Sequence, residues 1–215
     1  MNAIVLILIA ANVILSFKGF ADRFFIERNK FQVGPILKGE QLRMLTSGFL
    51  HVDQAHLFFN MFALYIFADE VIDEVGVLKF VIIYFGSLLA GSSLALSMHK
   101  REPYYSAVGA SGAVMGIVYA AIMLNPDMRL SFIFFPVFSF PGWVFGVGYF
   151  LYSIYGMKAQ LGNIGHSAHM GGAIGGFVLT LALYPQIFLE NRNIILILAL
   201  PIILMFLFKD KLERN

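Results

Sequence analysis

The sequence predicts an all-α membrane protein that crosses the bilayer several times. Hydrophobic residues make up 59% of its 215 residues and charged residues only 13%, whereas a soluble domain is about a quarter charged. The mean hydropathy of +0.79 agrees with this prediction. The apolar residues also form continuous runs without two-residue alternation, and in a bilayer such runs satisfy their backbone hydrogen bonds as helices.

The composition also excludes several classes of protein. The shortage of charge and the abundance of apolar residues rule out a disordered chain and a nucleic-acid-binding domain. The chain has no cysteine, which excludes disulfides, thiolate metal sites and catalytic thiols. A net charge of +2 does not predict an acidic partner.

Seven apolar runs predict the membrane helices. A hydrocarbon core about 30 Å thick requires roughly 20 helical residues, and the runs cover residues 2–17, 55–68, 78–98, 111–124, 141–156, 166–184 and 193–208. We expect one membrane domain over 1–215, with a core of six helices over 1–184 and a seventh helix at 193–208. The first run has no basic residue before it and no small-residue cleavage site after it, so we interpret it as a retained helix and not as a signal peptide.

Two connections between the runs are unusual. The first, from Lys18 to about Leu50, carries six of the fifteen Lys and Arg residues together with several phenylalanines, which predicts a structure lying in the membrane interface. The second follows the second run and holds an acidic cluster. We expect that cluster, formed by Asp69, Glu70, Asp73 and Glu74, to be a solvated end of the second helix at the turn that follows it.

Ser111 opens the fourth run within Gly109-Ala110-Ser111-Gly112. The helix from Ser111 to Leu124 would be about 21 Å long, roughly 9 Å shorter than the membrane core. Ser111 is therefore expected to begin its helix below the membrane surface, after a non-helical segment (104–110) that lines a watery cavity or is buried in protein. A Gly-flanked serine at a helix N-terminus suits a nucleophile, and the alternative role is a simple helix cap.

His169 lies at the start of the sixth run, on a helical face that also carries small residues. The fourth run has a matching small-residue face, and such faces let membrane helices approach closely. The glycines of the two faces are Gly112, Gly116, Gly172 and Gly176. Contact between these faces would bring the side chains of Ser111 and His169 together, and a serine within hydrogen-bonding reach of a histidine is a nucleophile with its general base.

His56 and Asn60 lie four residues apart on the second run, so their side chains point the same way. A neutral imidazole and a carboxamide both donate hydrogen bonds and suit an oxyanion. The alternative is a polar contact between helices. His51 precedes this helix, and we expect it at the end of the loop in the membrane interface.

Other chemistries are disfavoured by what the sequence lacks. It has no HExxH motif, and no carboxylate is placed to complete a catalytic zinc site with His166 and His169, so we expect neither a metal nor a cofactor. No acid accompanies Ser111 and His169, which favours a dyad over a triad. A transporter would require polar residues along several runs or an inverted repeat, and neither is found.

Together these motifs resemble those of the rhomboid intramembrane serine proteases. The GxSG nucleophile motif of that family matches residues 109–112, and its sixth-helix histidine motif matches residues 168–176. Its second-helix HxxxxHxxxN motif matches residues 51–60. All three motifs occur in the family's order, and with the helix count the resemblance extends over nearly the whole chain.

The resemblance implies a role for each residue. Ser111 would be the nucleophile and His169 its general base, while His56, Asn60 and the backbone amide of Ser111 would bind the oxyanion. The helix-packing glycines would be Gly109, Gly112, Gly116, Gly172 and Gly176.

Two positions depart from the family pattern. The first loop of the family carries a Trp-Arg pair, and here the match is Leu42-Arg43, so Arg43 is present without the tryptophan anchor. Met115 stands where many relatives carry an aromatic ring beneath the histidine. A stacking ring that orients His169 is therefore not expected from that position.

Charge and family architecture disagree on the orientation in the membrane. If seven helices alternate, the side that holds the first loop carries twelve Lys and Arg and the other side only Lys79, Arg129 and Arg192, which would place the first loop in the cytoplasm. Rhomboid architecture implies that this loop and the mouth of the active site are extracytoplasmic. We expect the family orientation, in the cytoplasmic membrane of a prokaryote, because a folded interfacial loop can retain its charges.

The resemblance thus implies an intramembrane serine endopeptidase that cleaves transmembrane proteins within the lipid bilayer with a Ser-His dyad. The alternative is a non-catalytic rhomboid-like protein that binds or escorts membrane helices. Relatives of that kind typically lack the serine or the histidine, whereas this chain has both.

Overall fold

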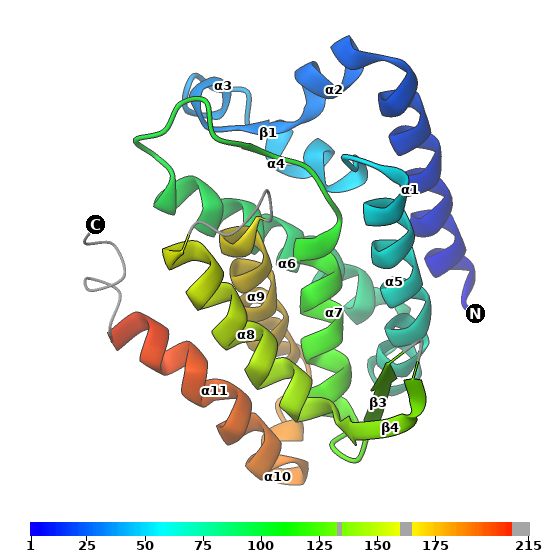
Figure 1. Cartoon of the computed structure of the whole chain (residues 1–215). Coiled ribbons are helices and arrows are strands. Elements are labelled where there is room, and N and C mark those ends of the chain that lie inside the picture. Colours follow the sequence, from blue (N-terminus) through cyan, green and yellow to red (C-terminus); the bar gives the residue numbers. More distant parts are fainter. Residues whose placement is uncertain (133–134, 160–164, 208–215) are drawn as a thin grey trace.

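The computed structural model describes residues 1–132, 135–159 and 165–207. Within these residues seven helices are at least fourteen residues long and form one bundle (Figure 1). They are α1 (Ala3–Ala21), α5 (Gln54–Val75), α6 (Val77–Met98), α7 (Ser111–Leu124), α8 (Gly142–Lys158), α9 (His166–Leu183) and α11 (Arg192–Leu207). The chain is therefore an all-α membrane protein with the predicted order of helices.

Helices α1, α5 and α6 are long enough and apolar enough to cross a membrane, while α7 and α11 are shorter apolar helices. The outer faces of the bundle expose large apolar side chains. Ile14 is 67% exposed and Leu78 73% exposed, and a bilayer would cover such side chains with lipid. The chain is thus a multi-pass membrane protein whose apolar surface lies against lipid.

Helix α7 lies inside the bundle, between α5 on one side and α8 and α9 on the other (Figure 1). Every residue from Gly112 to Met123 is buried, because neighbouring helices cover the whole circumference of α7. Tyr119 shows how a polar atom is accommodated there, since its hydroxyl donates a 2.7 Å hydrogen bond to the carbonyl oxygen of Gly146 on α8. A helix only fourteen residues long is therefore supported on all sides by its neighbours.

The first loop folds into a layer above the start of α7 (Figure 1). It contains α2 (Arg23–Asn29), β1 (Phe31–Gln32), α3 (Val33–Leu37), α4 (Arg43–Thr46) and the 3-10 helix η1 (Ser47–Phe49). Strand β1 pairs antiparallel with β2 (Ser106–Ala107), which leads into α7. The first loop is thereby attached to the segment that precedes Ser111.

Arg43 connects the parts of this layer. Its Nη1 donates to the carbonyl oxygens of Glu27 (2.7 Å) and Lys30 (3.2 Å), and its Nε donates to a carboxylate oxygen of Glu40 (2.7 Å). The neighbouring Leu42 is 77% exposed. Arg43 therefore ties the end of α2 to α4.

The acidic cluster lies in the last turns of α5 with Glu70, Asp73 and Glu74 exposed, so it is a solvated helix end as predicted, although the helix extends past the predicted residue 68. The last turns of α5 bury Val71, Ile72 and Val75 on one side, and this apolar face keeps the helix intact until Gly76, which adopts a φ of +82° and ends it. On the other side, Asp69 accepts a 3.0 Å hydrogen bond from the amide of Asn2. The helix extends beyond the apolar run because its last turns are amphipathic, with one apolar and one acidic face.

A hairpin and a short helix complete the described chain. Strands β3 (Arg129–Phe132) and β4 (Phe135–Pro141) pair antiparallel between α7 and α8, which the sequence did not predict because a continuous apolar run suits a strand as well as a helix. Helix α10 (Ile187–Glu190) precedes α11. The last residue of the predicted seventh run, Phe208, lies outside the described residues.

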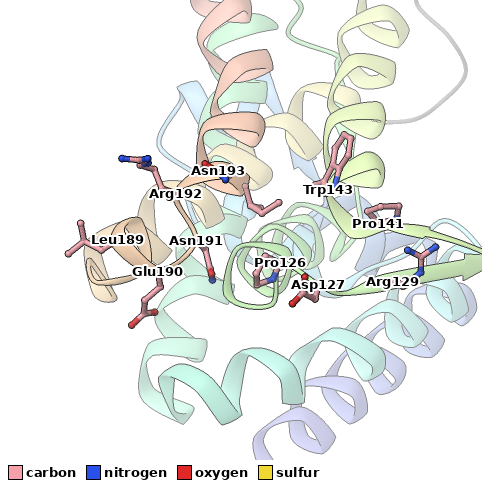
Figure 2. Close-up of a pocket in the computed structure, with 11 residues that line it drawn as sticks. Pro126, Asp127, Arg129, Pro141, Trp143, Leu189, Glu190, Asn191, Arg192 and Asn193 are labelled. Atoms are coloured by element: carbon pink, nitrogen blue, oxygen red, sulfur yellow. The ribbon is translucent and has the colours of Figure 1, made fainter.

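A cavity of about 760 Å³ opens at the C-terminal end of α7, the end opposite Ser111 (Figure 2). Asn191 lies in it and donates a 2.9 Å hydrogen bond to the carbonyl oxygen of Met123, so it caps the end of α7. The lining includes Asp127, Arg129, Trp143 and Arg192 and none of the predicted site residues. This cavity is therefore separate from the site described next.

Candidate active site

Ser111 is the first residue of α7 and follows a tightly constrained turn. Gly109 has a φ of +140°, which side-chain-bearing residues rarely adopt, and a Cβ there would lie 2.8 Å from the His56 ring. The amide of Gly109 donates a 3.0 Å hydrogen bond to the carbonyl oxygen of Ser47 in η1. The turn thus fixes Ser111 with its hydroxyl near the His56 ring and its backbone amide at the free N-terminus of a helix.

His169 lies on the first turn of α9, and its Nε2 is 2.5 Å from Ser111 Oγ. His169 is 8% exposed, whereas Ser111 is half-buried. A Cβ on Gly172 would overlap the backbone of Gly112, and a Cβ on Gly176 would overlap the backbone of Gly116. The absence of side chains at these glycines therefore lets α7 and α9 approach closely enough for the serine and histidine to meet.

Helix α6 makes the other close contacts of this region. A Cβ on Gly116 would overlap Ser87 of α6, and a Cβ on Gly171 would lie 2.7 Å from the carbonyl oxygen of Ala90. Gly91 of α6 is similarly pressed against the carbonyl oxygen of Ala168. Three helices, α6, α7 and α9, are therefore packed backbone to backbone beneath the Ser111–His169 pair.

His56 and Asn60 lie on the first two turns of α5, on the side that faces the start of α7. Asp53 caps α5 by accepting a 2.7 Å hydrogen bond from the amide of His56, and the His56 ring lies against Gly109. Asn60 is 7% exposed, and its Nδ2 donates a 2.9 Å hydrogen bond to the carbonyl oxygen of His56. The structure therefore brings three predicted groups to one place: the His56 ring, the Ser111 hydroxyl and the turn at Gly109.

His51 lies at the end of the loop before α5, as expected, and it is fully buried in the protein. Its Nδ1 lies 2.9 Å from Ser16 Oγ on α1, and its Nε2 lies 3.4 Å from the amide of Ala110. The Ser16 hydroxyl donates in turn to the carbonyl oxygen of Phe49 at 3.1 Å. These partners require a neutral ring that carries its proton on Nδ1, because Nε2 accepts from Ala110.

The surroundings of His51 explain its protonation state. Burial, followed by the nearby His56, lowers the pKa of His51 to about 3, since an apolar environment penalises the charged form. His51 is thus neutral at pH 7 and connects α1, the first loop and the residue before Ser111. The HxxxxHxxxN pattern identified this residue, but its link to Ser16 depends on the packing of α1.

Tyr149 is a site residue that the sequence reasoning missed. It comes from α8, and its hydroxyl oxygen is 2.6 Å from Nδ1 of His169. The two rings are tilted by 32° with centroids 5.9 Å apart. Met115, from which no stacking ring is expected, is an apolar side chain buried inside the bundle. The signal that could have revealed Tyr149 is the aromatic spacing of Phe145, Tyr149 and Tyr152 on one face of α8.

The arrangement contains the parts of an acyl-transfer site. It combines a hydroxyl beside an imidazole, a helix N-terminus that supplies a backbone N–H, and polar side chains on an adjacent helix. Within the described part of the chain no three His, Asp or Glu residues are grouped so that they could hold a metal ion. The fold and the site together define a multi-pass membrane protein with a serine–histidine pair enclosed among its helices.

The chain belongs to the rhomboid family, because residues 38–186 match the family model described as Rhomboid domain. It is 34% identical over 150 residues to "Rhomboid protease GluP" of Bacillus subtilis, an alignment that covers 69% of this chain and 27% of that protein. It is 31% identical over 139 residues to "Presenilin-associated rhomboid-like protein, mitochondrial" of Mus musculus, covering 62% of this chain and 36% of that one. It is 29% identical over 184 residues to "RHOMBOID-like protein 12, mitochondrial" of Arabidopsis thaliana, covering 78% and 54%.

These alignments span between about a quarter and a half of the length of the relatives. They nevertheless confirm the predicted family. The Bacillus relative is named as a protease, and the other two are named as mitochondrial rhomboid-like proteins.

Proposed function

We propose that this protein is an intramembrane serine endopeptidase that hydrolyses peptide bonds in or near the transmembrane segments of other membrane proteins. The observation that carries the proposal is the 2.5 Å separation of His169 Nε2 and Ser111 Oγ. Burial of His169 among α7, α8 and α9 restricts this pair to one geometry. The protease name of the Bacillus subtilis relative supports the same activity.

In the proposed mechanism, Ser111 Oγ attacks the scissile carbonyl carbon while His169 Nε2 accepts the hydroxyl proton. His169 then gives this proton to the departing amine, and a water molecule hydrolyses the acyl-enzyme by the reverse sequence. The amide of Ser111, the His56 ring and the second N–H of Asn60 Nδ2 donate to the oxyanion. No cofactor enters these steps.

The substrate must reach a site that begins beneath the first-loop layer. An extended peptide exposes its backbone carbonyl groups to attack. In a transmembrane helix the same carbonyl groups accept hydrogen bonds within the helix. We therefore propose that substrates are single-span proteins with helix-breaking residues near the cut, which unwind locally before reaching Ser111. The proposed location is the cytoplasmic membrane of a prokaryote, supported by the bacterial relative, with the site opening to the extracytoplasmic side.

The test is cleavage by the purified protein in liposomes that also contain a single-span substrate. We expect Ser111→Ala and His169→Ala each to lower the rate by at least about 1000-fold, because loss of either member of such a pair removes covalent catalysis. Ser93→Ala is the matched control, because Ser93 is an exposed serine on α6. A fluorophosphonate probe should label the unmodified protein and the control but not Ser111→Ala.

The same experiment separates the proposal from its alternative, a non-catalytic rhomboid-like protein that binds membrane helices. Cleavage that persists in purified Ser111→Ala protein would refute the enzyme assignment. Retention of an intact substrate by unmodified protein, with no probe labelling, would favour the binding protein.

A further inference from the structure

The described structure gives His169 a second partner besides Ser111. Nδ1 of His169 lies 2.6 Å from the Tyr149 hydroxyl oxygen, and Nε2 lies 2.5 Å from Ser111 Oγ. The two ring nitrogens are thus held by side chains from two different helices, α8 and α7. A partner at Nδ1 determines which nitrogen of a neutral histidine carries the proton.

Helix α8 holds the Tyr149 ring in place. Phe145, one turn earlier, stacks on it with centroids 5.5 Å apart and an interplanar angle of 21°. Tyr152 lies on the other side with centroids 6.1 Å apart. Near the C-terminal end of α8, a Cβ on Gly156 would overlap the ring of His166 on α9. Helices α8 and α9 are therefore in close contact there. The Tyr149 hydroxyl is consequently positioned by packing on both sides of its ring.

The proton arrangement determines whether His169 can act as a base. Nε2 must be unprotonated to accept the proton of Ser111 Oγ, so the proton of the neutral ring must be on Nδ1. An N–H at Nδ1 requires an acceptor, and the hydroxyl oxygen of Tyr149 is at hydrogen-bonding distance. After proton transfer the imidazolium donates from both nitrogens, and the same oxygen then accepts a charge-assisted hydrogen bond.

We propose that Tyr149 is a positioning residue that acts through His169, by accepting a hydrogen bond from Nδ1–H and holding the imidazole in the tautomer that can deprotonate Ser111. This inference rests on the proposed serine endopeptidase function. Tyr149 remains a neutral phenol throughout, since only the Ser111 proton moves, from Oγ to Nε2. The pair of Ser111 and His169 thus becomes a three-residue chain in which a phenol occupies the place of an acid.

The kinetic test compares Tyr149→Phe with Tyr119→Phe in liposomes containing a single-span substrate. Both substitutions delete one tyrosine hydroxyl that makes a short hydrogen bond inside the bundle, but the Tyr119 hydroxyl donates to the backbone of Gly146. We expect Tyr149→Phe to lower kcat about 10- to 100-fold, the range for loss of a hydrogen bond to a charged group, with KM within about twofold. Tyr119→Phe should lower thermal stability and leave kcat and KM unchanged. An unchanged kcat in Tyr149→Phe would overturn the proposal.

A spectroscopic test needs no turnover. In ¹⁵N-histidine-labelled protein, the His169 signals are identified by comparison with His169→Ala. We expect the Nδ1–H tautomer in unmodified protein and a mixture of tautomers in Tyr149→Phe. An Nε2–H tautomer in the unmodified protein would overturn the proposal whatever the kinetics. If unmodified protein failed to cleave any substrate, the proposed protease function would be refuted, and this spectrum would still decide the role of Tyr149.

Discussion

Individual buried polar residues connect the helices of this apolar bundle to its proposed active site. An unpaired polar group in an apolar interior costs about 1–3 kcal/mol, so burial strongly favours a hydrogen-bond partner. Ser16 illustrates this, because its hydroxyl lies between His51 and the carbonyl oxygen of Phe49. A residue on the first helix is thereby connected, through His51, to the backbone amide next to the proposed nucleophile.

The neutral state of His51 predicts a dependence of stability on pH. Because burial lowers the pKa of His51 to about 3, against about 6.5 in the unfolded chain, the unfolded state binds the extra proton between these values. Stability from this residue is therefore complete above about pH 6.5 and is lost as the pH falls toward 3. Between pH 7 and pH 5 the loss amounts to about 2 kcal/mol.

His51→Asn tests this dependence, since the carboxamide can donate to Ser16 but does not titrate. We expect the variant to be less stable than the unmodified protein at pH 7, because it loses the acceptor for the Ala110 amide. Its melting temperature should fall less between pH 7 and pH 5. Equal falls for the two proteins, measured by thermal unfolding in detergent, would show that His51 does not supply the proton linkage.

At the scale of elements, the contact between α7 and α9 determines whether the site exists. Membrane helices gain little free energy by moving apolar side chains from lipid to a helix interface, because lipid is equally apolar. Their association therefore depends on close packing. Gly172 and Gly176 of α9 supply that packing against the backbones of Gly112 and Gly116. Any side chain at these positions would force the helices apart and separate Ser111 from His169.

Gly172→Ala should therefore be severely disruptive, although alanine is the better helix former. Overpacking costs typically 1–3 kcal/mol, and here the opposing atoms are backbone atoms that cannot move aside. The control is Gly148→Ala on α8, where an added Cβ meets nothing within 4 Å and helix propensity predicts a gain of up to about 1 kcal/mol. Thermal unfolding and cleavage assays on both variants provide the comparison. A Gly172→Ala protein as stable and active as Gly148→Ala would contradict the packing argument.

The elements also show which features the sequence could predict. The meeting of Ser111 and His169 could be predicted because each residue lies in a fixed helical relation to its glycines, and the glycine faces limit how two helices pack. The aromatic spacing on α8 marks Tyr149 as a candidate, but its contact with His169, like that of Ser16 with His51, depends on how α8 and α1 are rotated against the bundle and could not be predicted. The hairpin of β3 and β4 was missed because apolar runs carry no period that separates strand from buried helix.

At the scale of the whole molecule, the two ends of the bundle differ in charge and structure. The end that contains Ser111 is covered by the first loop, where Lys30 pairs with Glu27 and Arg43 with Glu40, each at 2.7 Å. The opposite end carries the cavity near Asn191 (Figure 2). The positive-inside rule counts the basic residues of short loops such as this one, so by itself it favours a cytoplasmic first loop. We nevertheless propose an extracytoplasmic site, the orientation that rhomboid architecture implies, because a folded interfacial layer can retain its charges despite the excess of Lys and Arg on that side.

The orientation can be measured directly because the chain contains no cysteine. Tyr104→Cys places a thiol on the Ser111 side, at a position 87% exposed, and Asp127→Cys places one at the exposed turn after α7. Neither change removes a positive charge, so the topological signal is preserved. In intact bacterial spheroplasts, a membrane-impermeant maleimide should label Tyr104→Cys at once and Asp127→Cys only after the membrane is permeabilised. The reverse pattern would place the proposed active site in the cytoplasm, and it would show that the basic residues of the first loop direct insertion despite their ion pairs.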